Sequence, residues 1–302
     1  MTFLKKIFVF SFILLCFHVS CKAEEYLGVW TTNMETVLAA KASQLKIGII
    51  SAKPFEQGSL LSLMQDVSVV HRGSRTYYQG RLFGIDTILT ISRVGKVAAA
   101  ATATDLIAVQ EVDVVIFIGT AGSTDEQVRR GDVVIANSLV QYDMDASPFV
   151  PPFTIPMIRI REFSPDIYLK ELAKKASDKF LSFQLNQVVS KETLHELSIS
   201  NPIVHEGLVG SGDRFISKLE QKNELKHKLP RLFCIEMEGA AVAQVAFEYD
   251  IPCLVIRIIS DTADHTAYQD FSRFLDIITP AYSQSIIKNL YDSLSMEQLR
   301  FR

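Results

Sequence analysis

The residues of this chain best able to do chemistry lie in short segments at the ends of predicted strands. All of these segments contain small residues, and some of them also contain carboxyl groups. The six segments are Ser51–Glu56, Ser92–Lys96, Gly119–Gly122, Gly210–Phe215, Glu236–Gly239 and Arg257–Asp261. Three of them supply carboxyl groups, from Glu56, Glu238 and Asp261, that could act as general acid or base. Each segment alone also fits a structural role, because glycine permits tight connections and carboxylates complement or cap helix N-termini.

The elements that must position these segments alternate between strands and helices over residues 46–295. Apolar runs predict strands over Lys46–Ile50, Thr76–Gly80, Ile85–Ile91, Asp113–Ile118, Val133–Val140, Glu206–Gly210, Leu232–Glu236 and Pro252–Ile259. Helices are predicted over Pro54–Leu63, Val94–Gln110, Ser164–Phe180, Gly239–Phe247, Asp270–Ile278 and Ala281–Leu294. This order predicts a single α/β domain with a mixed, mostly parallel β-sheet flanked by helices. In such sheets ligands bind beyond the carboxyl ends of the strands.

The rest of the chain has weaker patterns. Segments without a predicted regular element are the lead-in at 24–45, the proline-rich 146–163, the polar insertion at 182–203 and the C-terminal tail at 296–302. The helix after the proline-rich segment has Ser164 as its predicted cap and Pro165 in its first position.

Residues 1–23 resemble an export signal. Two lysines precede the apolar run Ile7–Phe17, and small residues follow it. That run is shorter than the roughly 20 residues that span a bilayer. Cleavage after Ala23 would release a soluble chain, whereas lipid attachment at Cys21 would give a lipoprotein, although His18 fits a lipobox poorly. We expect an exported bacterial protein, periplasmic or membrane-attached; the alternative is an uncleaved anchor or a buried helix.

Composition narrows the function classes. The 302 residues are 48% hydrophobic and 22% charged, which is typical of a globular protein and excludes a disordered chain. A net charge of −3 without a basic face argues against a nucleic-acid partner. Cys234 and Cys253 lie in predicted strands, where two buried free thiols are favoured over a disulfide. The sequence has no zinc-type cluster of Cys and His, so we expect neither metal nor cofactor.

Taken together and in order, the six segments resemble the 5′-methylthioadenosine/S-adenosylhomocysteine nucleosidase branch of the purine nucleoside phosphorylase superfamily. The most specific stretches are DVVIFIGTAG (113–122), CIEMEGAAVAQV (234–245) and VIRIISDTAD (255–264), supported by GLVGSGDRF (207–215). The resemblance covers residues 46–294 and implies a three-layer, nucleoside phosphorylase-like fold.

The resemblance implies hydrolysis of the N-glycosidic bond of a 5′-modified adenosine, with release of adenine. By motif position, Asp261 is the acid that protonates adenine N7, and Glu56 is the base that orients the attacking water. Glu238 accepts hydrogen bonds from the ribose hydroxyls. Two carboxyl groups can take opposite roles when their environments separate their pKa values.

Other site residues are implied in the same way. Met237 packs against the sugar, and Arg257 orders the water and Glu238. Phe215 stacks on the base, whose edge the backbone of Ile216 contacts. The supporting positions are Ser92, Ser260 and Glu236.

Two alternatives use the same fold. Phosphorolysis would need fixed cationic donors, but Phe117 stands where hexameric phosphorylases have arginine, and Glu56 would repel phosphate. Arg93 departs from the nucleosidase pattern and could bind an anion, contact a substrate carboxylate or face solvent. The other alternative is an exported protein that binds nucleosides without turning them over.

The 5′ end of the substrate is the least defined by the resemblance. The segment 141–145 reads QYDMD, where the family often has Tyr-His-Asp-x-Asp. Phe149 matches an apolar position that reaches into a partner's site, so the resemblance and the apolar 149–158 loop imply a homodimer.

Overall fold

The computed structural model describes residues 27–28, 31–41, 44–261 and 272–300 of the chain. The export signal predicted for residues 1–23, with Cys21, lies outside these ranges and stays a prediction. Among the described helices, none combines the length and the apolar character needed to cross a bilayer.

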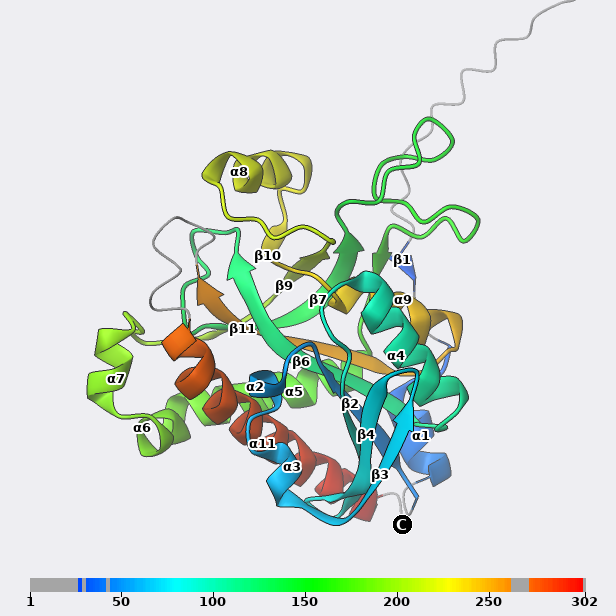
Figure 1. Cartoon of the computed structure of the whole chain (residues 1–302), viewed down its shortest axis with the longest axis vertical. Helices are drawn as coiled ribbons and strands as arrows, with labels where there is room; N and C mark the ends of the chain where they lie inside the picture. The colour runs from blue at the N-terminus through cyan, green and yellow to red at the C-terminus, as the bar shows by residue number, and fades with distance from the viewer. Residues whose placement is uncertain (1–26, 29–30, 42–43, 262–271, 301–302) are drawn as a thin grey trace, which may run out of the picture.

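An eleven-stranded mixed sheet forms the centre of the protein (Figure 1). Its strands are β1 (Leu27–Gly28), β2 (Lys46–Ser51), β3 (Met64–Arg72), β4 (Arg75–Leu82), β5 (Ile85–Ile91), β6 (Val114–Ser123), β7 (Val133–Gln141), β8 (Glu162–Phe163), β9 (Val204–Ser211), β10 (Leu232–Glu236) and β11 (Cys253–Asp261). The order across the sheet is β1-β8-β7-β9-β10-β6-β2-β5-β4-β3, and β11 pairs with both β6 and β7. Strand β2 is parallel to β5 and β6, whereas β10 is antiparallel to β6. The predicted mixed α/β fold is therefore confirmed.

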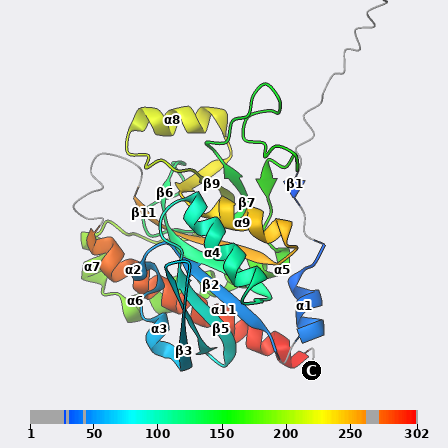
Figure 2. The ribbon, with the colours of Figure 1, turned by 45° about the vertical axis from the view of Figure 1, so that its right-hand side comes forward.

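Helices cover both faces of the sheet (Figure 2). They are α1 (Met34–Lys41), α2 (Pro54–Gln57), α3 (Leu60–Leu63), α4 (Lys96–Ala108), α5 (Ile167–Lys179), α6 (Leu185–Val188), α7 (Lys191–Glu196), α8 (Leu219–Lys228), α9 (Gly239–Glu248) and α11 (Thr279–Arg300), with π-helical segments η1 (Phe180–Gln184) and η2 (Phe274–Ile278). Side chains alternate between the faces of each strand. Ile47 and Ile49 of β2 thus join a core with α1, α5 and α11, whereas Ile50 joins a core with α4 and α9.

Helix α1 lies in the segment where no regular element was predicted. Its Met34 and Leu38 are fully buried in the core shared with α5. Asp166 joins the two helices, because its carboxylate accepts hydrogen bonds from the Met34 N–H at 2.9 Å and the Leu169 N–H at 2.7 Å. Burial raises the pKa of the Asp166 carboxyl group. Asp166 caps α5, and the prediction of Ser164 as the cap was wrong because the helix begins two residues later.

The region between β2 and β4 also differs from the prediction. The single helix predicted over Pro54–Leu63 is two short helices, α2 and α3. Gly58 separates them with a φ of 55°, and a Cβ there would lie 2.8 Å from the Cα of Pro280. Strand β3 was missed because it is an edge strand with mostly exposed side chains and little apolar alternation.

Strand β6 continues through Gly119–Gly122, where a strand-to-helix turn was predicted. It does so because Gly122 and Ser123 pair with Ile235 and Cys234 of β10. The Gly119–Gly122 segment is thereby held inside the sheet, and the Thr120 N–H donates to Glu56 from there.

Two further predictions concern the C-terminal half. The closing helices predicted at Asp270–Ile278 and Ala281–Leu294 form one helical run from residue 272 to Arg300, whereas 262–271 lies outside the described residues. Pro280 is the second residue after the π-helical segment η2. Proline has no N–H to donate to the preceding turn of an α-helix, and the wider π-helical turn accommodates it. The insertion at 182–203 contains α6 and α7. Cys234 and Cys253 are buried free thiols, as favoured.

Candidate active site

A pocket lies where β2, β6, β9, β10 and β11 end. Eight of the residues predicted to act on substrate line it: Glu56, Phe215, Ile216, Glu236, Met237, Glu238, Ser260 and Asp261. These residues come from four segments that are far apart in the sequence. The fold therefore brings the predicted carboxyl groups to one place, at the edge of the sheet where ligands bind in folds of this class.

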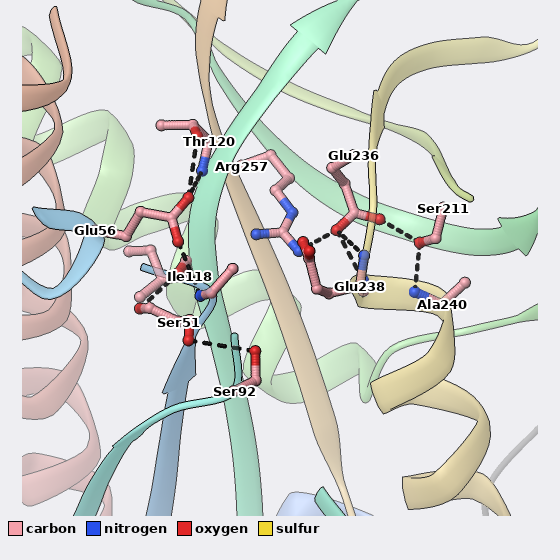
Figure 3. A network of polar contacts seen from close by, with 12 residues as sticks. Ser51, Glu56, Ser92, Ile118, Thr120, Ser211, Glu236, Glu238, Ala240 and Arg257 are labelled. Carbon is pink, nitrogen blue, oxygen red and sulfur yellow. Dashed lines mark hydrogen bonds and ion pairs between the residues drawn. The ribbon is translucent and has the colours of Figure 1, made fainter. Parts of the chain in front are cut away.

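Glu56 is anchored at the first turn of α2 (Figure 3). Its side chain is 3% exposed. Oε2 accepts hydrogen bonds from the N–H groups of Ala52 and Lys53, at 2.8 and 2.9 Å. Oε1 accepts from the N–H and the hydroxyl of Thr120, at 2.9 and 3.0 Å. Three of these donors are backbone N–H groups, which suit an ionised carboxylate and fix its direction.

Glu236 and Arg257 form a buried ion pair beside the pocket. Oε2 of Glu236 contacts Nη2 of Arg257 and accepts from the N–H groups of Glu238 and Gly239, at 3.0 and 2.8 Å. The other oxygen accepts from the Ser211 hydroxyl (Figure 3). This carboxylate has donors on both oxygens, so its position is set by β9, β11 and the start of α9 together.

Glu238 has a buried carboxyl group whose pKa is raised. Its Oε1 accepts from the Gly95 N–H at 2.8 Å, and its side chain is buried. Burial, followed by the charge of Glu236, raises the pKa of Glu238 to about 7. Arg257 and the Gly95 hydrogen bond act in the opposite direction. The two carboxyl groups at Glu56 and Glu238 thus have unlike surroundings, one rich in hydrogen-bond donors and one mainly desolvated.

Gly119 keeps Arg257 and Glu56 close together. A Cβ at Gly119 would lie 2.5 Å from Nη1 of Arg257 and 2.9 Å from Oε1 of Glu56, so only glycine fits. The Arg257 guanidinium also lies over the Phe117 ring, 4.2 Å from its centroid. Arg257 is 1% exposed and lies beside the lining instead of within it. Its ion pair is with Glu236, not with Glu238, which it was predicted to order.

Asp261 closes the pocket at the end of β11. Oδ2 accepts a hydrogen bond from the Ser260 hydroxyl at 2.8 Å. The final residues of β11 shift in register against β6, between Ile259 and Asp261, so the strand bends at this point. Such a shift re-aims a side chain, and it places Asp261 in the lining.

Two predicted substrate contacts lie elsewhere in this chain. Ser92 is fully buried behind the pocket, and its hydroxyl donates to the Arg93 carbonyl at 2.7 Å. Phe149 is 91% exposed on the 142–161 connection and does not line the pocket. Its predicted place in a partner's site, and the homodimer, stay predictions.

Nine pocket residues were not predicted as site residues, and four of them have polar or charged side chains: Lys53, Thr120, Tyr142 and Arg214. The signal for Thr120 was present in the GTAG stretch, but only the sheet shows that its N–H faces Glu56. The Tyr142 hydroxyl donates to the Arg214 carbonyl at 2.9 Å, and the Tyr142 ring fills the space above Gly212, where a Cβ would lie 2.4 Å from it.

Two positions that were considered in relation to anion binding, Phe117 and Arg93, lie outside the pocket. Phe117 is fully buried, and the Arg93 guanidinium donates to the Ser74 carbonyl. Neither residue lines the pocket. Within the described part of the chain, no three His, Cys, Asp or Glu side chains are placed to hold a metal ion.

Comparison with known proteins is consistent with this geometry. The family model described as the phosphorylase superfamily matches residues 46–285. The 5′-methylthioadenosine/S-adenosylhomocysteine nucleosidase of Neisseria meningitidis, solved with methylthio-immucillin-A, is 30% identical with a TM-score of 0.72, covering 82% of this chain and 99% of that chain. Futalosine hydrolase of Helicobacter pylori is 31% identical with a TM-score of 0.69, covering 83% and 98%. The S-adenosylhomocysteine nucleosidase of Streptococcus pyogenes is 29% identical with a TM-score of 0.70, covering 83% and 98%. The chain therefore belongs to the phosphorylase superfamily, in the branch of these nucleosidases.

Proposed function

We propose that this protein hydrolyses the N-glycosidic bond of 5′-modified adenosines, such as methylthioadenosine and S-adenosylhomocysteine, to adenine and the 5′-modified ribose. One observation carries the proposal: Glu56, Glu238 and Asp261, from three distant segments, line a single pocket. The solved relatives with nucleosidase activity in their names support it.

The proposed reaction divides the work between the carboxyl groups. Asp261 gives a proton to adenine N7 while the bond between C1′ and N9 breaks, so that adenine leaves as a neutral molecule. Glu56 takes a proton from the water that attacks C1′, and the second water proton stays on the new ribose hydroxyl. The proton on Glu56 then returns through solvent to Asp261.

The other residues bind and position. Ionised Glu238 accepts hydrogen bonds from the ribose hydroxyls, and Met237 packs against the sugar. Phe215 is 74% exposed at the pocket, where it is available to stack on the base. Arg257 and Glu236 act through their neighbours, because their ion pair fixes the start of α9, from which Glu238 projects.

Water is the proposed nucleophile, and phosphate is disfavoured by charge. By the resemblance, the segment that supplies Glu56 replaces the phosphate-binding turn of the phosphorylases, and its carboxylate, held by four hydrogen bonds, would repel phosphate. The arginine of the hexameric phosphorylases is replaced by Phe117, whose ring is covered by the already paired Arg257.

The experiment is a parallel assay of the purified chain on methylthioadenosine, S-adenosylhomocysteine, adenosine and inosine, with free base measured with and without phosphate. We expect adenine from the 5′-modified adenosines at a rate independent of phosphate. Dependence on phosphate would select a phosphorylase, and no base from any substrate would select a binding protein.

A further inference from the structure

Two cations at the mouth of the pocket have no role in the proposed chemistry at the base and ribose. Lys53 follows β2 and Arg214 follows β9, and both residues are exposed members of the lining. Strands β10 and β6 separate β9 from β2 in the sheet. The two cations therefore flank the pocket from opposite sides.

Neither cation forms an ion pair within the described part of the chain, although the charge of Arg214 acts on the carboxyl group of Glu224. The Lys53 ammonium lies over the Phe55 ring, 5.7 Å from its centroid. Phe55 itself packs against the core that contains α11, so the ring supports the ammonium at the mouth.

The backbone of both residues is fixed by the pocket. The Lys53 N–H donates to Glu56 at 2.9 Å, and the Arg214 carbonyl accepts from Tyr142 at 2.9 Å. Their side chains are long and free to reach a ligand, whereas their points of attachment are rigid. This is the arrangement expected of residues that contact the outer part of a ligand.

The pocket thus has acidic side chains in its inner part and cationic side chains at its mouth. Glu56, Glu236, Glu238 and Asp261 line its inner part, where Arg257 forms an ion pair with Glu236 among the described residues, and Lys53 and Arg214 lie at its mouth. An anionic group bound in the interior would meet like charges, whereas one bound at the mouth would be attracted. A ligand with a neutral base and ribose and an anionic outer end would fit the charges of both the inner part and the mouth.

We propose that the pocket prefers adenine nucleosides whose 5′ substituent carries an anionic group, a carboxylate or a phosphate, and that Lys53 sets this preference. The inference rests on the proposed function, because it requires the ribose hydroxyls to lie at Glu238. Lys53 is the better placed of the two cations, since its own N–H is bonded to Glu56 beside the reacting carbon.

The test compares kcat/KM for adenine release from two substrates without a charged 5′ group, adenosine and methylthioadenosine, and two whose 5′ group carries an anion. These are adenosine 5′-monophosphate, with a phosphate, and the zwitterion S-adenosylhomocysteine, with a carboxylate; they are called the anionic substrates below. The variants are Lys53→Met and, as a matched control, Lys191→Met on exposed α7. In Lys53→Met the ratio of anionic to neutral kcat/KM should fall about tenfold, mainly through a higher KM for the anionic substrates. In Lys191→Met the ratio should stay at the wild-type value.

The four substrates distinguish the possible outcomes. A fall confined to adenosine 5′-monophosphate identifies phosphate as the anion, and one confined to S-adenosylhomocysteine identifies carboxylate; either supports the inference. An unchanged ratio, or equal losses on neutral and anionic substrates, overturns it, since Lys53 would then act only through Glu56. Wild-type protein that releases no adenine from any substrate refutes the proposed function as well.

Discussion

Replacing Glu238 by glutamine should remove a pH dependence of folding stability that the buried carboxyl group creates. Burial and the charge of Glu236 raise the pKa of Glu238 from 4.5 to about 7. Between these values the folded protein holds a proton that the unfolded chain has released. The free energy of unfolding therefore falls as pH rises through this window. At about 1.4 kcal/mol per pH unit, the loss reaches roughly 3 kcal/mol above pH 7.

The assay is urea unfolding at closely spaced pH values from 4.5 to 8, on wild-type protein, Glu238→Gln and the exposed control Glu248→Gln on the same helix. Glutamine keeps an oxygen that accepts the Gly95 N–H, so the comparison isolates the charge. The stability difference between wild type and Glu238→Gln should change by roughly 3 kcal/mol across the window, in favour of the variant at high pH. Parallel curves for the two proteins would refute the reasoning, as would the same change in Glu248→Gln.

Three further substitutions test the contacts around the pocket. Arg257→Met leaves the Glu236 carboxylate buried without its counter-charge, and should lower the free energy of unfolding by about 3–5 kcal/mol in urea titrations; a loss under about 1 kcal/mol would show that the pair is not needed. Gly119→Ala places a methyl group against Arg257 and Glu56, and should lower kcat/KM for adenine release at least about 100-fold while circular dichroism stays native. Wild-type turnover in this variant would contradict the close approach. Thr120→Val removes the hydroxyl bonded to Glu56 at similar volume and should lower kcat about tenfold; an unchanged kcat would mean that the three backbone N–H groups are enough to orient the carboxylate.

Much of the fold could be predicted from the sequence because the central strands are apolar on both faces. The run from Val114 to Ile118 is fully buried, and its β-branched residues predict a buried strand. The edge strand β3 could not be found in this way, since its side chains face solvent. Helix α1 was missed although Asn33 caps it locally, with its side-chain oxygen accepting from the Thr36 N–H at 2.9 Å, because the helix is short and has little amphipathic pattern. Its contact with Asp166, which lies 132 positions from Met34, depends on the fold.

The site likewise combines features that the local sequence predicts with contacts that only the fold creates. Glu56, Glu238 and Asp261 could be proposed from the sequence because each follows or ends a predicted strand, and Glu238 and Asp261 also lie in the most specific stretches. Partnerships that depend on packing were not found, and the contact between Thr120 and Glu56 is one of them. Arg257 was predicted to order Glu238, but its ion-pair partner is Glu236, because the packing of β11 against the start of α9 brings that carboxylate to it.

The central claim is that Asp261 and Glu56 cleave a nucleoside with water. The most direct measurement is adenine release from methylthioadenosine by wild type and by Asp261→Asn, with and without phosphate, on protein shown to be folded by its unfolding transition. The account predicts phosphate-independent release by wild type and at least about a 100-fold loss in Asp261→Asn, since general acid catalysis contributes about that much. Full activity in Asp261→Asn, or release only with phosphate, would contradict it.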